Sequence, residues 1–576
     1  MLHMWEMPKP RQVADQANTI SANVQSLARP VLCGLASGLA GLYAAFVGIL
    51  VLMHGRVIIV DVLTLGQCFL LMLGLAAGAK SHAVAVPRAI LADVARGVVA
   101  GSVYGAVLAV GLALFQVAFL RTVLVSLSPD LRRMLSLGLE TGQAMATLII
   151  AGALLGAVGS LWRRLGEGQR KVTLTVVIAV IVAGALQQLL QTVLQRFSVT
   201  KAIGELLFNW AGLRWQGALL IGALAASVSS SWPLAKRAFG ARQPRLHAML
   251  ADNRSAVQLG LLLLGLSLLP ALAGPYIGQV LLMVALYTLM GMGLNIEVGL
   301  AGLLDLGFVA FFAVGAYTTA LLTADSPVAL SAYTSIPALS FWLAAPIAVI
   351  LSVIVGVLFG LPVLGVRGDY LAVATLGLGE IVRVIVLSDF AAPVLNGAQG
   401  VLQVPKPFLG SMELSSPVSL FYLTLVCSMF AAFVAWRLQG SRLGRAWMAL
   451  RDDEEVAQAL GVNLVKAKLL AYGLGAAFAG LAGAIFATML TSVYPNSFNL
   501  LLSINVLALI VIGGIGSIQG VIVGAILLVG LPELLREFGE YRFLFYGAAL
   551  IAIMIMRPKG LWSTIQPSRA TSGGSR

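Results

Sequence analysis

The sequence predicts an all-α, polytopic helical membrane protein with about 14 spanning or re-entrant segments. Of its 576 residues, 59% are hydrophobic and 10% are charged, and the mean hydropathy is +0.96. An average soluble domain has about 25% charged residues. This chain cannot cover a soluble fold with charge, which disfavours a soluble globular protein, a disordered chain and a nucleic-acid-binding domain.

The basic residues indicate orientation in a membrane. The formal net charge is +14, but the lysines and arginines lie in short links between apolar runs, as expected where basic loops set topology. The three cysteines each lie inside an apolar run without C-x-x-C spacing, and the four histidines are scattered. We therefore predict no metal site, no disulfide framework, no catalytic residues and no nucleic-acid partner.

The first 256 residues divide into three predicted segments: a cytoplasmic segment at 1–30, an accessory six-span region at 31–232, and a cytoplasmic linker at 233–256. With the N-terminus inside, the cytoplasmic links of this part carry 15 Lys and Arg residues and the opposite links carry 7. This bias favours a cytoplasmic N-terminus.

Residues 257–565 form a second predicted region, whose apolar runs are uneven and rich in glycine. The run 499–530 is too long for a single span, so we expect the glycines at 513–517 to split it. Broken helices of this kind are tolerated where they line a protected cavity. The glycines we assign to a pathway or gating role, with close packing as the alternative, are Gly299, Gly302, Gly513 and Gly514.

Four charged residues lie within or beside these runs, where charge is costly and marks a pathway or an internal pair. Glu380 and Arg383 are three residues apart and can pair on one helix face. For Asp369, a pathway role and a capping role both stay open. Asp305 is expected to line the path or to brace the backbone.

A long loop at about 438–467 has basic flanks and a cluster of acids. The pattern predicts a short helix at Glu454–Leu460, with acids at its positive end and Gly461 at its exit. Such a helix is either a docking element for a soluble partner or a solvated loop helix.

Within this loop, the stretch Glu455-Val-Ala-Gln-Ala-Leu-Gly461 resembles the E-A-A-x-x-x-G loop of ABC importer permeases, with Val456 in place of the first alanine. Further stretches resemble the branched-chain amino acid permease family, and within it the M-type subunit. They are Gly299–Tyr317, Arg367–Arg383, Gly513–Ser517 and Arg557–Leu561.

The resemblance implies an ABC importer permease fold in residues 257–565 and a subunit of a binding-protein-dependent importer in the bacterial inner membrane. Two cytoplasmic ATPases, a second permease subunit (H-type or another copy of this chain) and a periplasmic binding protein are the implied partners. The implied residues of the coupling loop are Arg451, Asp453, Glu454, Glu455 and Gly461. The tail at 566–576 would be cytoplasmic.

We expect no cofactor to be bound by this chain, and ATP to be used by the partner subunits. No lysine follows a glycine, so the sequence has no phosphate-binding G-x-x-x-x-G-K loop. An ion-coupled secondary transporter is the main alternative, but it would favour inverted repeats, and none is evident. A membrane-embedded enzyme would need converging catalytic groups.

Three questions stay open at this point. The stretch Asn396-Gly-Ala-Gln-Gly400 departs from the Thr-Gly-Gly-Pro type of turn common in the family. The family handles leucine-like amino acids, urea and short amides, and the sequence does not choose among them. The purpose of residues 1–256 and the residues that line the pore are also undetermined.

Overall fold

The computed structural model divides the chain into two compact units, unit 1 at Met1–Val257 and unit 2 at Gln258–Arg576. For residues 10–27 and 233–242 and for a few others, Asp369 among them, only the backbone is described. The predicted tail at 566–576 and most of the predicted linker lie outside the described residues. The residues described are 10–60, 62–81, 90–114, 128–136, 138–195, 198–209, 212–242, 265, 268–271, 273–324, 338–366, 368–536, 542–558 and 560–562.

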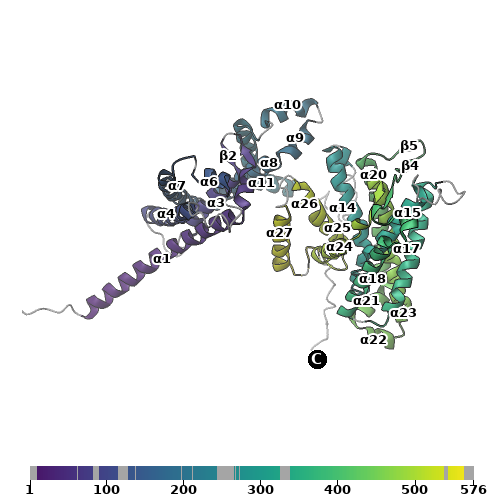
Figure 1. Ribbon diagram of the computed structural model, residues 1–576. Coiled ribbons are helices and arrows are strands. Elements are labelled where there is room, and N and C mark those ends of the chain that lie inside the picture. Colours follow the sequence, from purple (N-terminus) through teal and green to yellow (C-terminus); the bar gives the residue numbers. More distant parts are fainter. Residues whose placement is uncertain are drawn as a thin grey trace, which may run out of the picture. The chain divides into compact units, whose positions relative to one another are not determined.

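Unit 1 is a helical bundle with one short antiparallel strand pair (Figure 1). Its elements are α1 (Pro10–Phe46), α2 (Ile49–His54), β1 (Val57–Ile59), β2 (Leu63–Thr64), α3 (Leu65–Lys80), α4 (Ile90–Leu114), α6 (Pro129–Ser136), α7 (Thr141–Arg164), α8 (Glu167–Ala185), α9 (Gln187–Leu194), α10 (Ser198–Leu207) and α11 (Trp215–Arg242).

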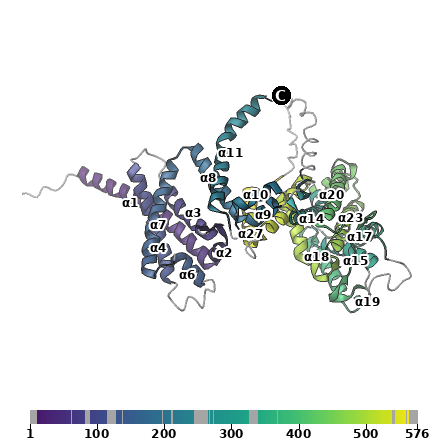
Figure 2. The same ribbon diagram turned by 90° about the horizontal axis from the view of Figure 1, so that it is seen from above.

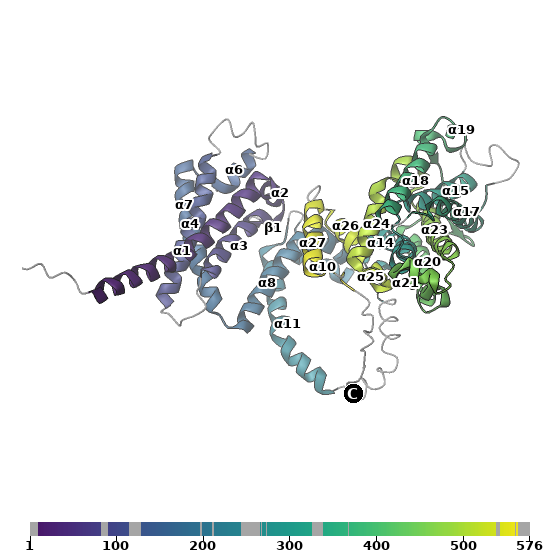
Figure 3. The same cartoon turned by 90° about the horizontal axis from the view of Figure 1, so that it is seen from below.

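Glycines bring α4 and α7 into backbone contact along their length, and Figure 3 shows these two helices side by side. A Cβ atom at Gly101 would lie 2.0 Å from the Gly152 carbonyl oxygen, and one at Gly105 would lie 2.3 Å from that of Leu148. Small residues are what allow membrane helices to approach this closely. At one end of the same pair, Arg164 of α7 forms an ion pair with the buried carboxylate of Asp93 on α4.

Unit 2 contains the remaining helices and two short strand pairs, β3 with β6 and β4 with β5. Its elements are α14 (Pro275–Leu294), η1 (Asn295–Leu300), α15 (Val309–Thr323), α17 (Phe341–Val363), α18 (Asp369–Leu387), α19 (Ala392–Leu395), η2 (Gly397–Gln399), β3 (Val401–Leu402), β4 (Phe408–Leu409), β5 (Met412–Glu413), α20 (Pro417–Gln439), α21 (Arg442–Asp452), α22 (Glu454–Ala459), α23 (Leu464–Leu490), β6 (Ser492–Val493), η3 (Pro495–Ser497), α24 (Leu500–Gly513), α25 (Ile518–Ala525), η4 (Ile526–Gly530), α26 (Leu531–Leu534) and α27 (Arg542–Met556).

Helix α23 is the centre of unit 2, with α14, α15 and α17 packed around it (Figure 2). A Cβ atom at Gly315 of α15 would lie 2.2 Å from the Gly480 carbonyl oxygen of α23, and one at Gly483 would lie 2.1 Å from that of Phe312. The turn at 396–400 is anchored to the end of α23, because β3 follows the turn directly and pairs with β6.

Two helices of unit 2 are broken. Helix α14 continues into the π-helical turn η1 and then into irregular backbone before α15 begins. The predicted split of the run 499–530 is confirmed, since α24 ends at Gly513 and α25 begins at Ile518, with Gly514 at φ +124° and Gly516 at φ +80°.

Among the described residues, ten helices are long and apolar enough to cross a membrane, and four shorter helices are apolar over 10–17 residues. Part of the region expected to form about 14 segments lies outside the described residues. Helix α11 (Trp215–Arg242) forms at the end of the expected six-span region at 31–232 but is not among these apolar helices.

Candidate functional site

The loop helix α21 is anchored to unit 2 by a buried tryptophan. Ser441 caps the helix by accepting a hydrogen bond from the Gly444 amide at 3.0 Å. Trp447 is fully buried, and its indole Nε1 donates to the Ala467 carbonyl at the start of α23, at 2.8 Å. The loop is therefore held rigidly against the spanning helices.

At the end of α21, Arg451 binds the π-helical turn η1 that follows α14. Its Nη1 donates to the Gly299 carbonyl oxygen at 2.7 Å. The side chain also lies on Gly302, where a Cβ atom would come within 2.6 Å of Arg451 Cγ, and where φ is +74°. Glycine is required there both for the backbone conformation and for the space.

The break between α24 and α25 contacts the same region through Gly516. The Gly516 amide donates to Asn295 Oδ1 at 2.9 Å, and Gln439 Nε2 donates to the Gly516 carbonyl at 2.9 Å. We call this assembly the coupling joint, and its members are Asn295, Gly299, Gly302, Gln439, Arg451 and Gly516.

Of the four glycines predicted for the pathway, Gly299 and Gly302 lie in the coupling joint. Gly513 and Gly514 lie in the adjoining break, where the Trp562 amide donates to the Gly513 carbonyl at 2.9 Å. Gly299, Gly302 and Gly513 have close backbone or side-chain neighbours, and Gly514 has φ +124°, so close packing or backbone conformation accounts for their being glycine. Their pathway role stays a prediction.

The second loop helix, α22, begins at the predicted residue, Glu454, and ends one residue before the predicted end. Asp453 caps it, with its Oδ1 accepting from the amides of Glu455 (2.9 Å) and Val456 (3.0 Å). Gly461 follows at φ +86°, with nothing within 4 Å of the position of a Cβ atom. Val456 and Leu460 are 54% and 76% exposed, so α22 presents an apolar surface flanked by charge.

The acids of the loop differ in position. Glu454 forms an ion pair with Lys468 of α23, with 2.7 Å between Oε1 and Nζ, and Lys468 also donates to the Leu364 carbonyl at 3.2 Å. Glu455 is exposed on the outer side of α22. Glu454 is thus tied to the body of unit 2, and Glu455 faces outward.

Asp305 braces the start of α15. Its Oδ1 accepts a hydrogen bond from the Gly307 amide at 2.7 Å, and the neighbouring Leu306 amide donates to Thr375 Oγ1 at 3.0 Å. The bracing role is therefore present. Glu297 is completely buried in η1 beside Asp305. The sequence did not indicate this residue as a site residue, because it lies in the short connection between two apolar runs.

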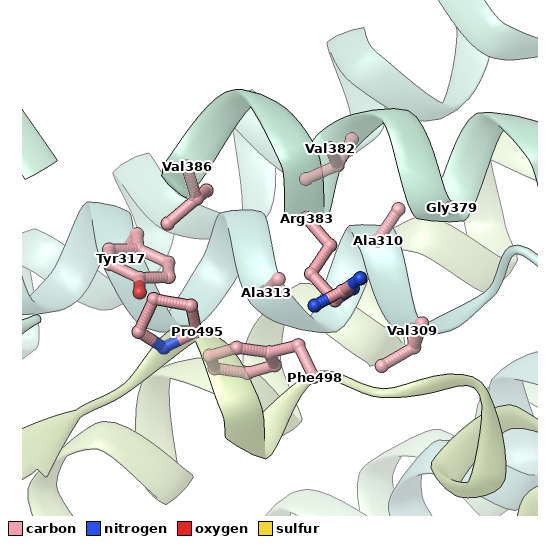
Figure 4. Close-up of a pocket in the computed structure, with 10 residues that line it drawn as sticks. All are labelled: Val309, Ala310, Ala313, Tyr317, Gly379, Val382, Arg383, Val386, Pro495 and Phe498. Carbon is pink, nitrogen blue, oxygen red and sulfur yellow. The ribbon is translucent and has the colours of Figure 1, made fainter. Parts of the chain in front are cut away.

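An apolar pocket lies between α15, α18 and the η3 segment, and Figure 4 shows its lining side chains. Its cavity volume is about 10 Å³, which is room for about one water molecule. The lining residues are Val309, Ala310, Ala313, Tyr317, Gly379, Val382, Arg383, Val386, Pro495 and Phe498.

Arg383 supplies the charge in this pocket. It pairs with Glu380 as predicted, and its Nε donates to Glu380 Oε1 at 2.8 Å. The Tyr317 hydroxyl is buried without a hydrogen-bond partner among the described residues. The sequence analysis did not assign Tyr317 or Phe498 a role. Asp369 begins α18, and its side chain lies outside the description.

Comparison with known proteins identifies the family. The family described as "branched-chain amino acid transport system / permease component" matches residues 276–554. The high-affinity branched-chain amino acid transport system permease protein LivM of Salmonella typhimurium (strain LT2) is 36% identical over 392 residues, which cover 63% of this chain and 89% of that protein. The chain belongs to this permease family.

Other relatives of this permease extend the comparison. LivM of Escherichia coli (strain K12) is 40% identical over 50% of this chain and 71% of its own length. LivH of the same strain is 28% identical over 30% of this chain and 55% of its own length. No solved structure matches. The match to the Salmonella protein covers 63% of this permease, which is more residues than unit 2 contains. The match therefore extends into unit 1.

Proposed function

We propose that this chain is a permease subunit of a binding-protein-dependent ABC importer in the bacterial inner membrane, and that it translocates branched-chain amino acids by alternating access. The observation that carries the proposal is the hydrogen bond from Arg451 to Gly299. It joins an exposed loop helix to a broken membrane helix, so that movement of one requires movement of the other.

The proposed partners follow from the exposed surface of α22 and from the relatives. Of the two cytoplasmic ATPases that would hold the ATP, one would dock on α22 of this chain, with Val456, Glu455 and Leu460 facing it. An H-type subunit or a second copy of this chain would complete the path, and a periplasmic binding protein would deliver the substrate. The loop then lies in the cytoplasm, together with both termini.

The apolar pocket would have to open to admit an amino acid, because its present volume is about 10 Å³. In the open form, valine, phenylalanine and proline side chains from α15, α18 and η3 would cover a branched aliphatic side chain. Arg383 would take the substrate carboxylate and Glu380 its ammonium group, and the two residues neutralise each other when no substrate is present.

Gentle affinity purification from the native membrane tests the assembly. Recovery of a P-loop ATPase with a second, shorter permease is the expected result, and ATPase alone would indicate a permease pair of identical chains. A chain that is purified alone and transports leucine in vesicles with an ion gradient but no ATP would overturn the importer proposal in favour of an ion-coupled transporter.

Substrate choice needs a second measurement with the reconstituted complex. ATP-driven uptake of labelled leucine should be inhibited by isoleucine and valine and left unaffected by urea and acetamide. Inhibition by urea alone would overturn the amino acid assignment without affecting the importer assignment.

A further inference from the structure

Beneath the coupling joint lie two carboxyl groups that no hydrogen-bond donor fully satisfies. Glu297 of η1 is 0% exposed, and neither of its carboxyl oxygens has a hydrogen-bond partner among the described residues. Asp305 is 1% exposed, and its Oδ2 has no partner in the same set, although its Oδ1 accepts from the Gly307 amide. The two side chains lie against each other.

The Glu297 side chain rests directly on α23, since a Cβ atom at Gly475 would lie 1.7 Å from Glu297 Oε1. Tyr472, on the same helix, is 3% exposed, and its hydroxyl has no hydrogen-bond partner among the described residues. The two carboxyl groups of η1 and the start of α15 are therefore packed against a helix that offers them no hydrogen-bond donor.

The cations on neighbouring elements are engaged elsewhere. Arg451 of α21 binds the Gly299 carbonyl and lies near Asp452, and Lys468 of α23 binds Glu454 and the Leu364 carbonyl. The other polar neighbours are neutral, namely Asn295, which accepts from the Gly516 amide, and Thr375, which accepts from the Leu306 amide. In the part of the chain that the structure describes, neither Glu297 nor Asp305 forms an ion pair.

Two buried anions side by side without a counter-ion are strongly disfavoured. Ionised carboxylates have only acceptor atoms, so neither can donate to the other. A single proton changes this, because a protonated Glu297 donates an O–H to Asp305 Oδ2. Paired carboxyls that share one proton are an established way to relieve like-charge repulsion.

We propose that Glu297 and Asp305 form a proton-binding site that holds one proton between their carboxyl groups. The bound proton joins η1 to the start of α15. The site therefore stabilises the backbone on which Arg451 acts. It does not depend on the substrate or on the partner subunits.

The test uses the purified full chain in lipid nanodiscs and needs no transport. Infrared absorption in D₂O should show a protonated-carboxyl band at neutral pH that is lost in Glu297→Gln. The matched control, Glu413→Gln on the exposed strand β5, should retain it. Glutamine keeps the size and the donor of a protonated glutamic acid, so the variant should fold.

The thermal midpoint provides the second measurement. A proton bound in the folded state and lost after unfolding makes stability fall as pH rises. The midpoint of the wild-type chain should therefore decrease between pH 6 and pH 9 more than that of Glu297→Gln. Absence of the infrared band from the wild-type chain would overturn the proton assignment. So would a rise of the wild-type thermal midpoint in saturating sodium that is absent in Glu297→Gln.

Discussion

In unit 1, Arg164 reaches from α7 to a carboxylate on α4, and in unit 2, Arg451 reaches from α21 to a backbone carbonyl at the end of a broken helix. The first contact joins two continuous helices that touch along interlocked glycines. The second joins a surface loop to the π-helical turn η1, which leads into irregular backbone. Both π-helical segments of the described chain, η1 and η4, also lie in unit 2.

The difference indicates which unit is built to change shape. Straight helices in backbone contact can shift relative to each other only by separating, which loses many packed contacts together. A π-turn followed by irregular backbone has fewer internal hydrogen bonds to break, and such turns are frequent at functional sites. We therefore expect changes in the coupling loop to affect uptake, and changes in unit 1 to affect stability.

The largest expected effect on uptake is at the outer surface of α22. Gly461→Val places a β-branched residue at φ +86°, which costs about 1–2 kcal/mol in the left-handed region, and Glu455→Lys reverses an exposed charge. Both should abolish ATP-driven uptake while membrane insertion remains intact, as measured by leucine uptake in reconstituted vesicles.

Gly461→Asn is the matched control, because asparagine tolerates positive φ and a Cβ atom there has nothing within 4 Å. It should retain most of the uptake. Normal uptake by both Gly461→Val and Glu455→Lys would contradict the coupling role of the loop.

Next in size is the loss of the Arg451 contact. Arg451→Ala leaves the Gly299 carbonyl without its partner, at a cost of about 1–3 kcal/mol, and each 1.4 kcal/mol corresponds to about a tenfold change. Uptake should fall about tenfold while the ATPase still co-purifies. Arg445→Ala on the same helix, where the side chain is exposed and donates to Gly440 at 3.2 Å, should have little effect. Equal losses of uptake in the two variants would mean that the coupling joint does not transmit movement from α21 to the broken helix.

Features decided by neighbours in the sequence could be predicted without the structure. The break at Gly513–Gly514 follows from a run too long for one span, and the Glu380–Arg383 pair follows from a spacing of three. The capped helix at Glu454 follows from acids placed before a short helical segment.

Contacts between distant residues could not be predicted in this way. Arg451 and Gly299 are 152 positions apart. Every residue has a backbone carbonyl, so the residue types in the sequence do not indicate which carbonyl an arginine binds. The pocket combines α15, α18 and η3, whose side chains are ordinary apolar residues. Glu297 differed from its neighbours in charge, but only the fold shows that it is buried beside Asp305.

A smaller effect on uptake is expected from a disruptive change in unit 1. Gly101→Val would force a side chain against the Gly152 carbonyl, which is 2.0 Å from the position of a Cβ atom, and overpacking of this kind costs about 1–3 kcal/mol. The yield of folded protein should fall, but uptake per folded molecule should stay within about twofold of the wild type. Gly142→Val on α7, with open space around it, is the control. Loss of uptake per molecule in Gly101→Val alone would show that unit 1 takes part in transport.

The smallest effect on uptake is expected at the C-terminal end of α23. Lys406 Nζ donates to the carbonyls of Thr488 and Met489, each at 2.9 Å, and burial lowers the pKa of its ammonium group. Lys406→Met should lower stability by about 1 kcal/mol, the typical value of such hydrogen bonds, without changing uptake. Because the unfolded chain binds this proton more tightly than the folded chain, Lys406 contributes stability that increases as pH rises. The thermal midpoint of Lys406→Met should therefore fall further between pH 7 and pH 9 than that of the wild type. Thermal midpoints of both proteins at pH 7 and pH 9 measure this. A midpoint of the variant that equals the wild type at both pH values would mean that Lys406 does not cap α23, and that its end is held by the β3–β6 pair alone.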